Sequence, residues 1–132
     1  MIIEDYDEIY SLWQITSKRA LSSSDSRESI KSYLDRNPGM STDAVCDGRI
    51  VGTVLAGHDG RTGFIHHTAV HPDYRRKHIG KALVESSLEK LGKSGIAKTQ
   101  IYCFHDNLTG QNFWQSMGFN RTDNVLFEKK AR

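Results

Sequence analysis

The stretch Val70–Leu83 constrains the fold more than any other part of this sequence. The residues before it, 64–70, are typical of a strand, and Pro72 ends that strand because proline has no N–H to donate to a sheet. Four basic residues follow at 75–78. Apolar residues across Ile79–Leu91 then recur at spacings of three and four, which predicts a helix. We therefore expect a strand, a cationic loop and a helix in succession.

The cationic loop has the properties of an anion site. The first backbone N–H groups of a helix have no partner inside the helix and carry partial positive charge. A loop that directs several of these groups inward binds anions such as phosphate. Gly80, in the first helical turn, would let a phosphate approach the backbone closely. The loop alone leaves a second interpretation open, which is a solvated basic turn before a helix.

The other periodicities complete a pattern of four helices and six strands. The predicted helices are Asp5–Arg19, a second one capped by Asp25 or Ser26 and ended at Asn37–Gly39, then Ile79–Leu91 and Thr109–Met117. The predicted strands are Asp43–Cys46, Arg49–Ala56, Phe64–Val70, Thr99–Phe104, Phe119–Thr122 and Val125–Lys129. Hairpins interrupted by helices indicate a mixed, mainly antiparallel sheet. One parallel pairing is expected, between strands 64–70 and 99–104.

Composition narrows the class of protein. The 132 residues are expected to form one domain, 1–132. A net charge of +2 is too small to favour nucleic acid as a partner. Cys46 and Cys103 have no metal-type spacing, so we expect no metal and two reduced thiols in a cytoplasmic protein. The acidic N-terminus lacks the basic region of a secretory signal, and no apolar run reaches the roughly 18–20 residues that span a bilayer, so neither a secretory signal nor membrane association is expected.

Three signatures in order resemble the GNAT superfamily of N-acetyltransferases. Val70–Leu83 resembles its acetyl-CoA motif, commonly written Arg/Gln-x-x-Gly-x-Gly/Ala. Downstream, Asn107–Phe119 is similar to the family's Asn-x-x-Ala-x-x-Phe-Tyr-x-x-x-Gly-Phe, and upstream Val45–Gly52 matches the preceding hairpin. The resemblance implies an α/β GNAT fold, with a mixed, mainly antiparallel sheet of six to seven strands flanked by about four helices. It also implies transfer of an acetyl group from acetyl-CoA to a primary amine of a small molecule or peptide.

The resemblance also assigns contacts with acetyl-CoA. The pantetheine arm would lie like an added strand against the backbone of residues 68–70, and the N–H of Val70 would polarise the thioester carbonyl. The loop and the first helical turn would hold the pyrophosphate. The cofactor-binding residues implied in this way are Thr68, Ala69, Val70, Arg75, Arg76, Lys77, His78, Ile79, Gly80, Lys81, Asn107, Phe113 and Trp114.

Three positions depart from the family pattern. His78 stands where the family has its first loop glycine, and Arg76 where a small residue is common. A backbone in a helical conformation at residue 78 would still let the loop amides bind, so we expect binding to be retained. Trp114 stands where the family often has a tyrosine that protonates the leaving thiolate. Tryptophan has no titrating hydroxyl, so we expect Trp114 to pack beside the pantetheine arm instead.

The base that deprotonates the amine is less constrained by the sequence. Regular alternation would place His66, Thr68 and Val70 on one face of the strand and His67 and Ala69 on the other. Some GNAT enzymes carry a histidine base four positions before the motif valine, which selects His66 here. An ordinary histidine pKa near 6.5 suits this role.

Several alternatives stay open. His67, His105 and a mechanism that relies on positioning without a single base all remain as answers to the question of the base. A non-catalytic or weakly catalytic module that binds or senses acyl-CoA is the alternative function. The identity of the acceptor amine is not specified by any motif. A homodimer is common in the superfamily, and the sequence leaves the oligomeric state open.

Overall fold

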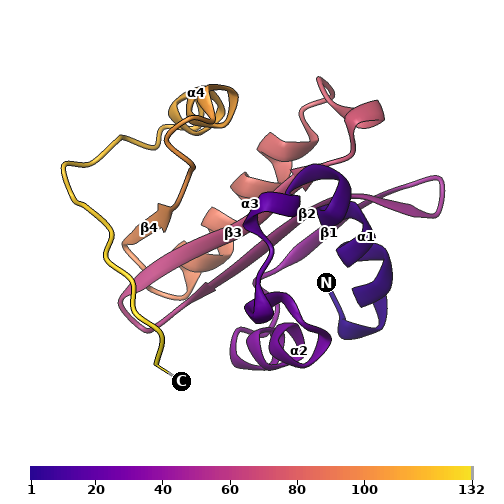
Figure 1. Cartoon of the computed structure of the whole chain (residues 1–132), viewed down its shortest axis with the longest axis horizontal. Coiled ribbons are helices and arrows are strands. Elements are labelled where there is room, and N and C mark those ends of the chain that lie inside the picture. Colours follow the sequence, from indigo (N-terminus) through magenta and orange to yellow (C-terminus); the bar gives the residue numbers. More distant parts are fainter. Residues whose placement is uncertain (132) are drawn as a thin grey trace. The chain divides into compact units, whose positions relative to one another are not determined.

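The computed structural model describes residues 1–131, which form two compact units, Met1–Tyr102 and a second that begins at Cys103. The first unit holds a four-stranded sheet (Figure 1). Its strands, in spatial order, are β1 (Thr42–Cys46), β2 (Arg49–His58), β3 (Thr62–Val70) and β4 (Lys98–Ile101). The first unit therefore carries the strand, loop and helix that the sequence singled out.

Three α-helices belong to the first unit and one to the second. They are α1 (Tyr6–Thr16), α2 (Arg27–Arg36), α3 (Ile79–Lys93) and, in the second unit, α4 (Leu108–Ser116). Short 3-10 turns are η1 (Ile3–Asp5), η2 (Lys18–Ala20), η3 (Ser23–Asp25) and η4 (Pro72–Tyr74). The order of the four predicted helices is confirmed, and Ser26 caps α2 by accepting a hydrogen bond from the N–H of Ser29.

The strand pairings are antiparallel for β1 with β2 and for β2 with β3, and parallel for β3 with β4. The predicted parallel pairing is therefore confirmed. The expectation of a mainly antiparallel sheet with six to seven strands is wrong, because residues 1–131 contain a mixed sheet of four strands. The strands predicted at Arg49–Ala56 and Phe64–Val70 are longer than expected, since β2 extends to His58 and β3 begins at Thr62.

The strands predicted at Phe119–Thr122 and Val125–Lys129 do not form. In the second unit α4 ends at Ser116, and Gly118, with a φ of 90°, then turns the chain away from the helix. Beyond it Val125, Leu126 and Phe127 are exposed. Alternating apolar residues give a segment strand character, but its N–H and C=O groups still need a partner. A hairpin paired only with itself is marginal in water.

β4 is also shorter than the sequence suggested, and this shapes the sheet edge. The last pair in the parallel ladder is Ile65 with Ile101. β3 continues for five more residues, 66–70, and within the described chain no strand pairs with them on that edge. An unpaired edge exposes N–H and C=O groups that are available to a ligand backbone.

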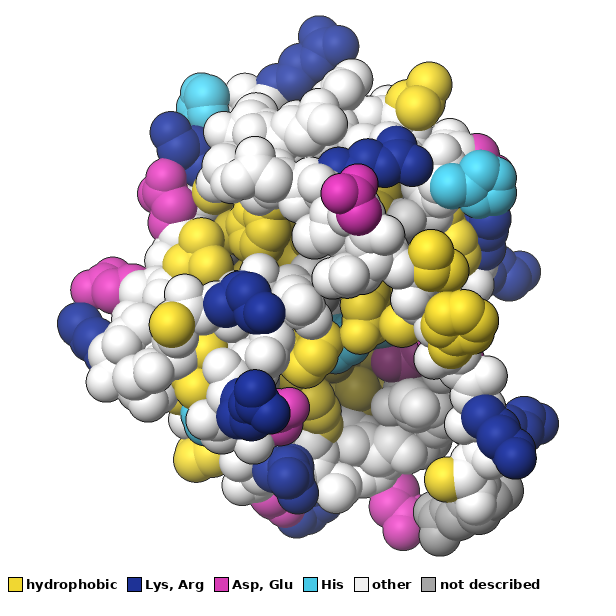
Figure 2. Space-filling model, turned by 90° about the vertical axis from the view of Figure 1, so that its left-hand side faces the viewer, with side chains coloured by type: hydrophobic (Ala, Val, Ile, Leu, Met, Phe, Trp, Pro, Cys, Tyr) yellow, Lys and Arg dark blue, Asp and Glu magenta, His cyan; other side chains and the backbone are white. Residues whose placement is uncertain are grey.

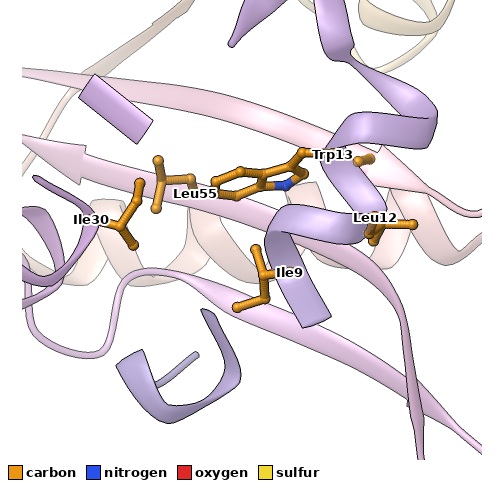
Figure 3. Packing of buried hydrophobic residues seen from close by; sticks show 6 residues of the cluster. Ile9, Leu12, Trp13, Ile30 and Leu55 are labelled. Atoms are coloured by element: carbon orange, nitrogen blue, oxygen red, sulfur yellow. The ribbon is translucent and has the colours of Figure 1, made fainter. Parts of the chain in front are cut away.

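Helices cover both faces of the sheet. On one face, α1 and α2 pack on β2 and β3 through a buried cluster, part of which is shown in Figure 3. Its members are Ile9, Leu12, Trp13, Ile30, Leu55 and Ala69. On the other face α3 lies so close to β2 that a Cβ atom at Gly52 would be 3.1 Å from side-chain atoms of Ile79 and Leu83. The start of α3 is thus held firmly against the sheet.

A β-bulge in β3 changes which side chains share a face. Leu55 pairs with His66 and Thr53 with Ala69, so two residues of β3 oppose one of β2. His67, inside the bulge, has a left-handed backbone with a φ of 44°. The predicted alternation is therefore wrong, because one extra residue shifts every later side chain to the opposite face. His66, His67 and Ala69 all face α1 and α2, as their contacts with Tyr33 (His66), with Trp13 (His67) and within the shared apolar cluster (Ala69) show.

Three contacts hold the bulge in place. The ring of His67 stacks on Trp13 with 4.3 Å between ring centroids, and its Nε2 lies 2.8 Å from Oδ1 of Asp25. Trp13 Nε1 donates to Thr53 Oγ1, and that hydroxyl donates to the carbonyl oxygen of His67. Burial by itself raises the pKa of Asp25, but the hydrogen bond and charge of His67 outweigh it, so this pKa lies below its ordinary value. The η3 turn is thereby tied to β3.

The pair of Asp25 and His67 is expected to stabilise the fold at pH values above the pKa that the Asp25 carboxyl has in the unfolded chain. A carboxyl group whose pKa is lowered by folding contributes stability that is present above its unfolded pKa, 3.8, and is lost as pH falls through the folded pKa. Asp25→Asn should lower the free energy of unfolding by about 1.5–3 kcal/mol at pH 7. Urea unfolding at pH 7 and pH 3 measures this. A difference between wild type and variant that did not shrink at pH 3 would contradict the assignment.

Candidate functional site

The loop between β3 and α3 contains two residues in the left-handed conformation. Arg76 has a φ of 63° and His78, which precedes α3, has a φ of 61° (Figure 1 shows this connection). These are the two positions where the family pattern has small residues or glycine. Glycine suits these positions because it adopts the left-handed conformation without the steric cost that a side chain brings. The helical backbone expected at residue 78 is not the right-handed one, since His78 has a left-handed conformation that carries a steric cost for histidine.

The loop and the first turn of α3 present a run of free backbone donors. The first hydrogen bond at the start of the helix runs from the N–H of Ala82 to the carbonyl of His78. No side chain caps this end. Within residues 1–131, the backbone N–H groups of 76–81 have no hydrogen-bond partner. Together with the helix dipole, these donors form a site suited to a phosphate or pyrophosphate group.

The basic side chains of the loop are exposed, and two of them have contacts inside the chain. Arg75 donates from Nε to the carbonyl oxygen of Val70, at 3.2 Å. The Nζ atom of Lys77 lies 5.5 Å from the ring centroid of Tyr74, which is a cation–π distance. Arg75 thus supports the junction of strand and loop.

The end of β3 contributes polar backbone groups and one buried hydroxyl group to the candidate site. The N–H of His71 donates to Val51 of β2. Because successive N–H groups of a strand point to opposite edges, the N–H of Val70 points to the unpaired edge. The Oγ1 atom of Thr68 is buried and has no hydrogen-bond partner among the described residues. A buried hydroxyl without a partner is costly, so this atom marks a place where a ligand's polar group would be stabilised.

His66 is the imidazole best suited to act as a base. Its ring meets Tyr33 edge-on and lies parallel to Phe64, and within residues 1–131 no hydrogen bond holds its nitrogens. Burial lowers the pKa of His66, and the neighbouring His67 lowers it further. His66 is therefore neutral near pH 7 and free to accept a proton. His67, by contrast, is committed to Asp25 and Trp13.

In the second unit the predicted residues form a local cluster. Asn107 caps α4, since its Oδ1 accepts a hydrogen bond from the N–H of Gly110 at 3.0 Å. Phe113 and Trp114 meet edge-on at 5.0 Å between centroids, and Trp114 meets Phe119 in the same way at 5.1 Å. These contacts show how the Asn107–Phe119 signature stabilises its own helix.

Sequence reasoning missed the surroundings of His66. Tyr33 and Arg36 of α2 line a cavity beside this histidine, together with residues of β2 and β3. One signal was present in the sequence. Gly57 falls inside β2, where a glycine often marks a close approach of another group. A Cβ atom at Gly57 would lie 2.6 Å from the Tyr33 hydroxyl.

The described residues also show how charges, candidate metal ligands and apolar helices are distributed. On the face shown in Figure 2, Lys and Arg side chains are spread among Asp and Glu and do not form one basic patch. Among residues 1–131, no group of three or more His, Cys, Asp or Glu side chains is placed to hold a metal ion. No helix in this range combines the length and the apolar character needed to cross a membrane.

Comparison with known proteins decides the family. A sequence model of the acetyltransferase (GNAT) family matches residues 6–119. The chain belongs to this family. An acetyltransferase from Yersinia pestis is 28% identical over 127 residues, which cover 96% of this chain and 89% of that protein. An acetyltransferase from Sodalis glossinidius is 28% identical over 123 residues, covering 93% and 86% respectively.

Solved structures show the same fold. The PaiA N-acetyltransferase from Thermoplasma acidophilum, in complex with coenzyme A, has a TM-score of 0.79 at 20% identity, covering 95% of this chain and 89% of that one. AAC(6')-Iy, in complex with a bisubstrate analogue of CoA, has a TM-score of 0.76 at 19% identity, covering 100% and 95%. The α/β GNAT fold with four helices is therefore confirmed, and its sheet here has four strands within residues 1–131.

The left-handed loop residues give a test of backbone strain. His78→Gly should leave the free energy of unfolding unchanged or raise it by up to about 1 kcal/mol, because glycine removes a steric cost of roughly 1–2 kcal/mol but is freer when unfolded. Lys77→Gly is the control, since residue 77 is not left-handed and should lose about 0.5–1 kcal/mol. Urea unfolding measures both. Equal losses in the two variants would contradict the geometry.

Proposed function

We propose that this protein transfers an acetyl group from acetyl-CoA to a primary amine of a small molecule or peptide. The observation that carries this proposal is the run of free N–H donors at 76–81, at the start of α3 and beside the unpaired end of β3. Family membership supports acetyl transfer in general. Similar solved proteins hold CoA or a CoA analogue, which supports a CoA-type cosubstrate.

The chain's own residues suggest how the cosubstrate would be held. The N–H groups of 76–81 would bind the pyrophosphate, and Gly80 keeps that surface free of a side chain. The free edge of β3 at residues 66–70 would bond to the pantetheine arm as an added strand. The buried Oγ1 of Thr68 would gain the partner that it lacks. For Asn107, Phe113 and Trp114 of the second unit, a role in binding the cosubstrate stays a prediction of the family resemblance.

The reaction needs a neutral amine and a polarised thioester carbonyl. Acetyl-CoA supplies the activated acetyl group. The N–H of Val70 is proposed to donate to the carbonyl oxygen as charge develops there. His66 is proposed to take the proton from the amine, directly or through water. As the new C–N bond forms and the C–S bond breaks, the sulfur of CoA leaves as thiolate and takes a proton from solvent, since Trp114 has none to give.

Gly80→Glu tests the pyrophosphate site. The added carboxylate should clash with and repel the ligand, so we expect affinity for acetyl-CoA to fall at least about 100-fold, roughly 2.7 kcal/mol, by calorimetry. Gly92→Glu makes the same change near the other end of α3, where a Cβ atom has nothing within 4 Å, and should bind normally. Equal affinity in both variants would sink the proposed site. His78→Gly should stay within about tenfold of wild type.

His66 is tested by pH dependence. A base must be neutral to act, and burial lowers the pKa of His66 below its ordinary 6.5. The acid limb of kcat/KM should therefore have its midpoint below pH 6.5, with activity rising as pH rises through it. His66→Gln should remove this limb and lower kcat by about 100-fold or more. Steady-state assays of thiol release from pH 5 to 8 provide the measurement. An unchanged acid limb in the variant would exclude His66 as the base.

Free-thiol release on a panel of amines separates catalysis from binding alone. Acetyl-CoA turnover with any amine supports the transferase. Tight binding of acetyl-CoA with no thiol release on any amine or peptide would favour the alternative, a module that binds acyl-CoA without turning it over. Trp114, in place of a tyrosine that could protonate the thiolate, is the feature that keeps this alternative in the test.

A further inference from the structure

A cavity of about 270 Å³ lies beside His66, on the face of the sheet that α2 covers. It is lined by Tyr33, Arg36, Asn37, Gly57, His58, Asp59, Phe64 and His66. All of these residues belong to the first unit. Drug-sized ligands occupy cavities of roughly 300–1,000 Å³, so this one suits a smaller molecule, about the size of an amino acid.

The position of the cavity relates it to the proposed chemistry. His66 lines the cavity and is the first residue of β3 beyond the last parallel pair, Ile65 with Ile101. The unpaired edge of β3 therefore begins at the residue that borders the cavity. An amine held there would lie beside the proposed base and near the end of the proposed path of the pantetheine arm.

Three side chains that line the cavity, those of Tyr33, Arg36 and His58, present hydrogen-bond donors. Burial raises the pKa of Tyr33 to about 12, so its hydroxyl keeps its proton near neutral pH. His58 accepts from the N–H of Gly60 at Nδ1, so its other ring nitrogen carries the proton. Arg36 is exposed, and no hydrogen bond or ion pair within residues 1–131 engages its guanidinium group. A guanidinium group with two further donors nearby is suited to a carboxylate.

The other polar side chains of the lining are already engaged. Asn37 is buried, with its Oδ1 accepting from the N–H of His58 and its Nδ2 donating to the carbonyl of Tyr33. Asp59 is the one anionic side chain in the lining, and its Oδ1 accepts from two backbone N–H groups of the turn, those of Arg61 and Thr62. These two residues shape the wall and the rim.

Acidic residues of the N-terminal helices do not supply a competing cation site next to the cavity. Asp25 is bound to His67 and to the N–H of Ser22. The Oε2 atom of Glu8 accepts from the N–H of Ile50. Neither carboxylate lines the cavity. The lining therefore carries two charged side chains, Asp59, whose Oδ1 is engaged by its own turn, and Arg36, whose guanidinium group is available to a ligand.

We propose that this cavity receives the acceptor, and that the acceptor is a small primary amine that also carries a carboxylate. The amine would lie beside His66, and the carboxylate would bind Arg36 with help from the Tyr33 hydroxyl and the free N–H of His58. The ring of Phe64 supplies an apolar wall for the carbon skeleton between the two groups. This inference rests on the proposed acetyl transfer, of which it names the acceptor class.

The test uses matched pairs of acceptors with the full-length protein. Each amino acid is compared with the amine that lacks its carboxylate, for example phenylalanine with phenethylamine and glutamine with 4-aminobutyramide. Thiol release from acetyl-CoA is expected to give a kcat/KM at least about tenfold higher for the carboxylated member of a pair. Equal values for both members across the panel would overturn the inference.

Two variants and a control locate the carboxylate. Arg36→Gln should reduce the preference for carboxylated amines about tenfold, mainly through KM. Tyr33→Phe removes only the hydroxyl and should reduce the preference by a smaller factor. Lys31→Gln removes a positive charge from the same helix outside the cavity and should keep the wild-type preference. A preference that survives Arg36→Gln intact would refute the role of Arg36.

Binding without acetyl-CoA separates failure of this inference from failure of the proposed function. NMR signals of the His66 ring are followed while the same amines are added. Shifts of the His66 signals that occur with carboxylated amines and vanish in Arg36→Gln would support the cavity. If no amine released thiol in that case, only the proposed acetyl transfer would be overturned. Thiol release combined with no preference for carboxylated amines and no shift of the His66 ring would overturn the cavity and leave acetyl transfer standing.

Discussion

The bulge at His67 is the constraint on which the candidate site depends. Its left-handed backbone is held by stacking on Trp13, by the hydrogen bond to Asp25 and by the hydroxyl of Thr53. A residue in this conformation costs energy, and only surrounding contacts of this kind keep it in place. Because the bulge reverses the alternation of side chains, it keeps both His66 and His67 on the face of the sheet that carries α1 and α2.

Two adjacent histidines consequently have different roles. His67 is nearly buried and links η3 (Ser23–Asp25) to β3, so it serves the architecture. His66 has free ring nitrogens and a pKa lowered mainly by burial, and it borders a cavity. The difference arises from the partners that the bulge gives to each ring and not from the residue type. One histidine orders the loop that covers the sheet, and the other is the one proposed to take part in proton transfer.

Beyond the C-terminal end of β3, unpaired backbone N–H groups form the proposed cofactor site. Proline ends the strand, and two left-handed residues, Arg76 and His78, turn the chain so that α3 starts without a side-chain cap. The uncapped N–H groups would be unfavourable in a helix end without a ligand or water. Packing of α3 on Gly52 fixes these donors relative to β3, which supports the proposal that an arm along the free edge and a pyrophosphate at the helix end belong to one ligand.

The sequence by itself determined the family, the order of the four helices, the parallel pairing and the strand–loop–helix site, because local periodicity, Pro72 and the spacing of Val70–Leu83 depend on neighbours in the chain. Only the tertiary structure decided the faces of β3, because the bulge requires Trp13, Asp25 and Thr53, which are distant in sequence. It also decided that residues 119–129 form no strand, since pairing needs a partner that apolar alternation cannot provide. The cavity beside His66 was likewise hidden, since α2 and β2 meet there only after folding.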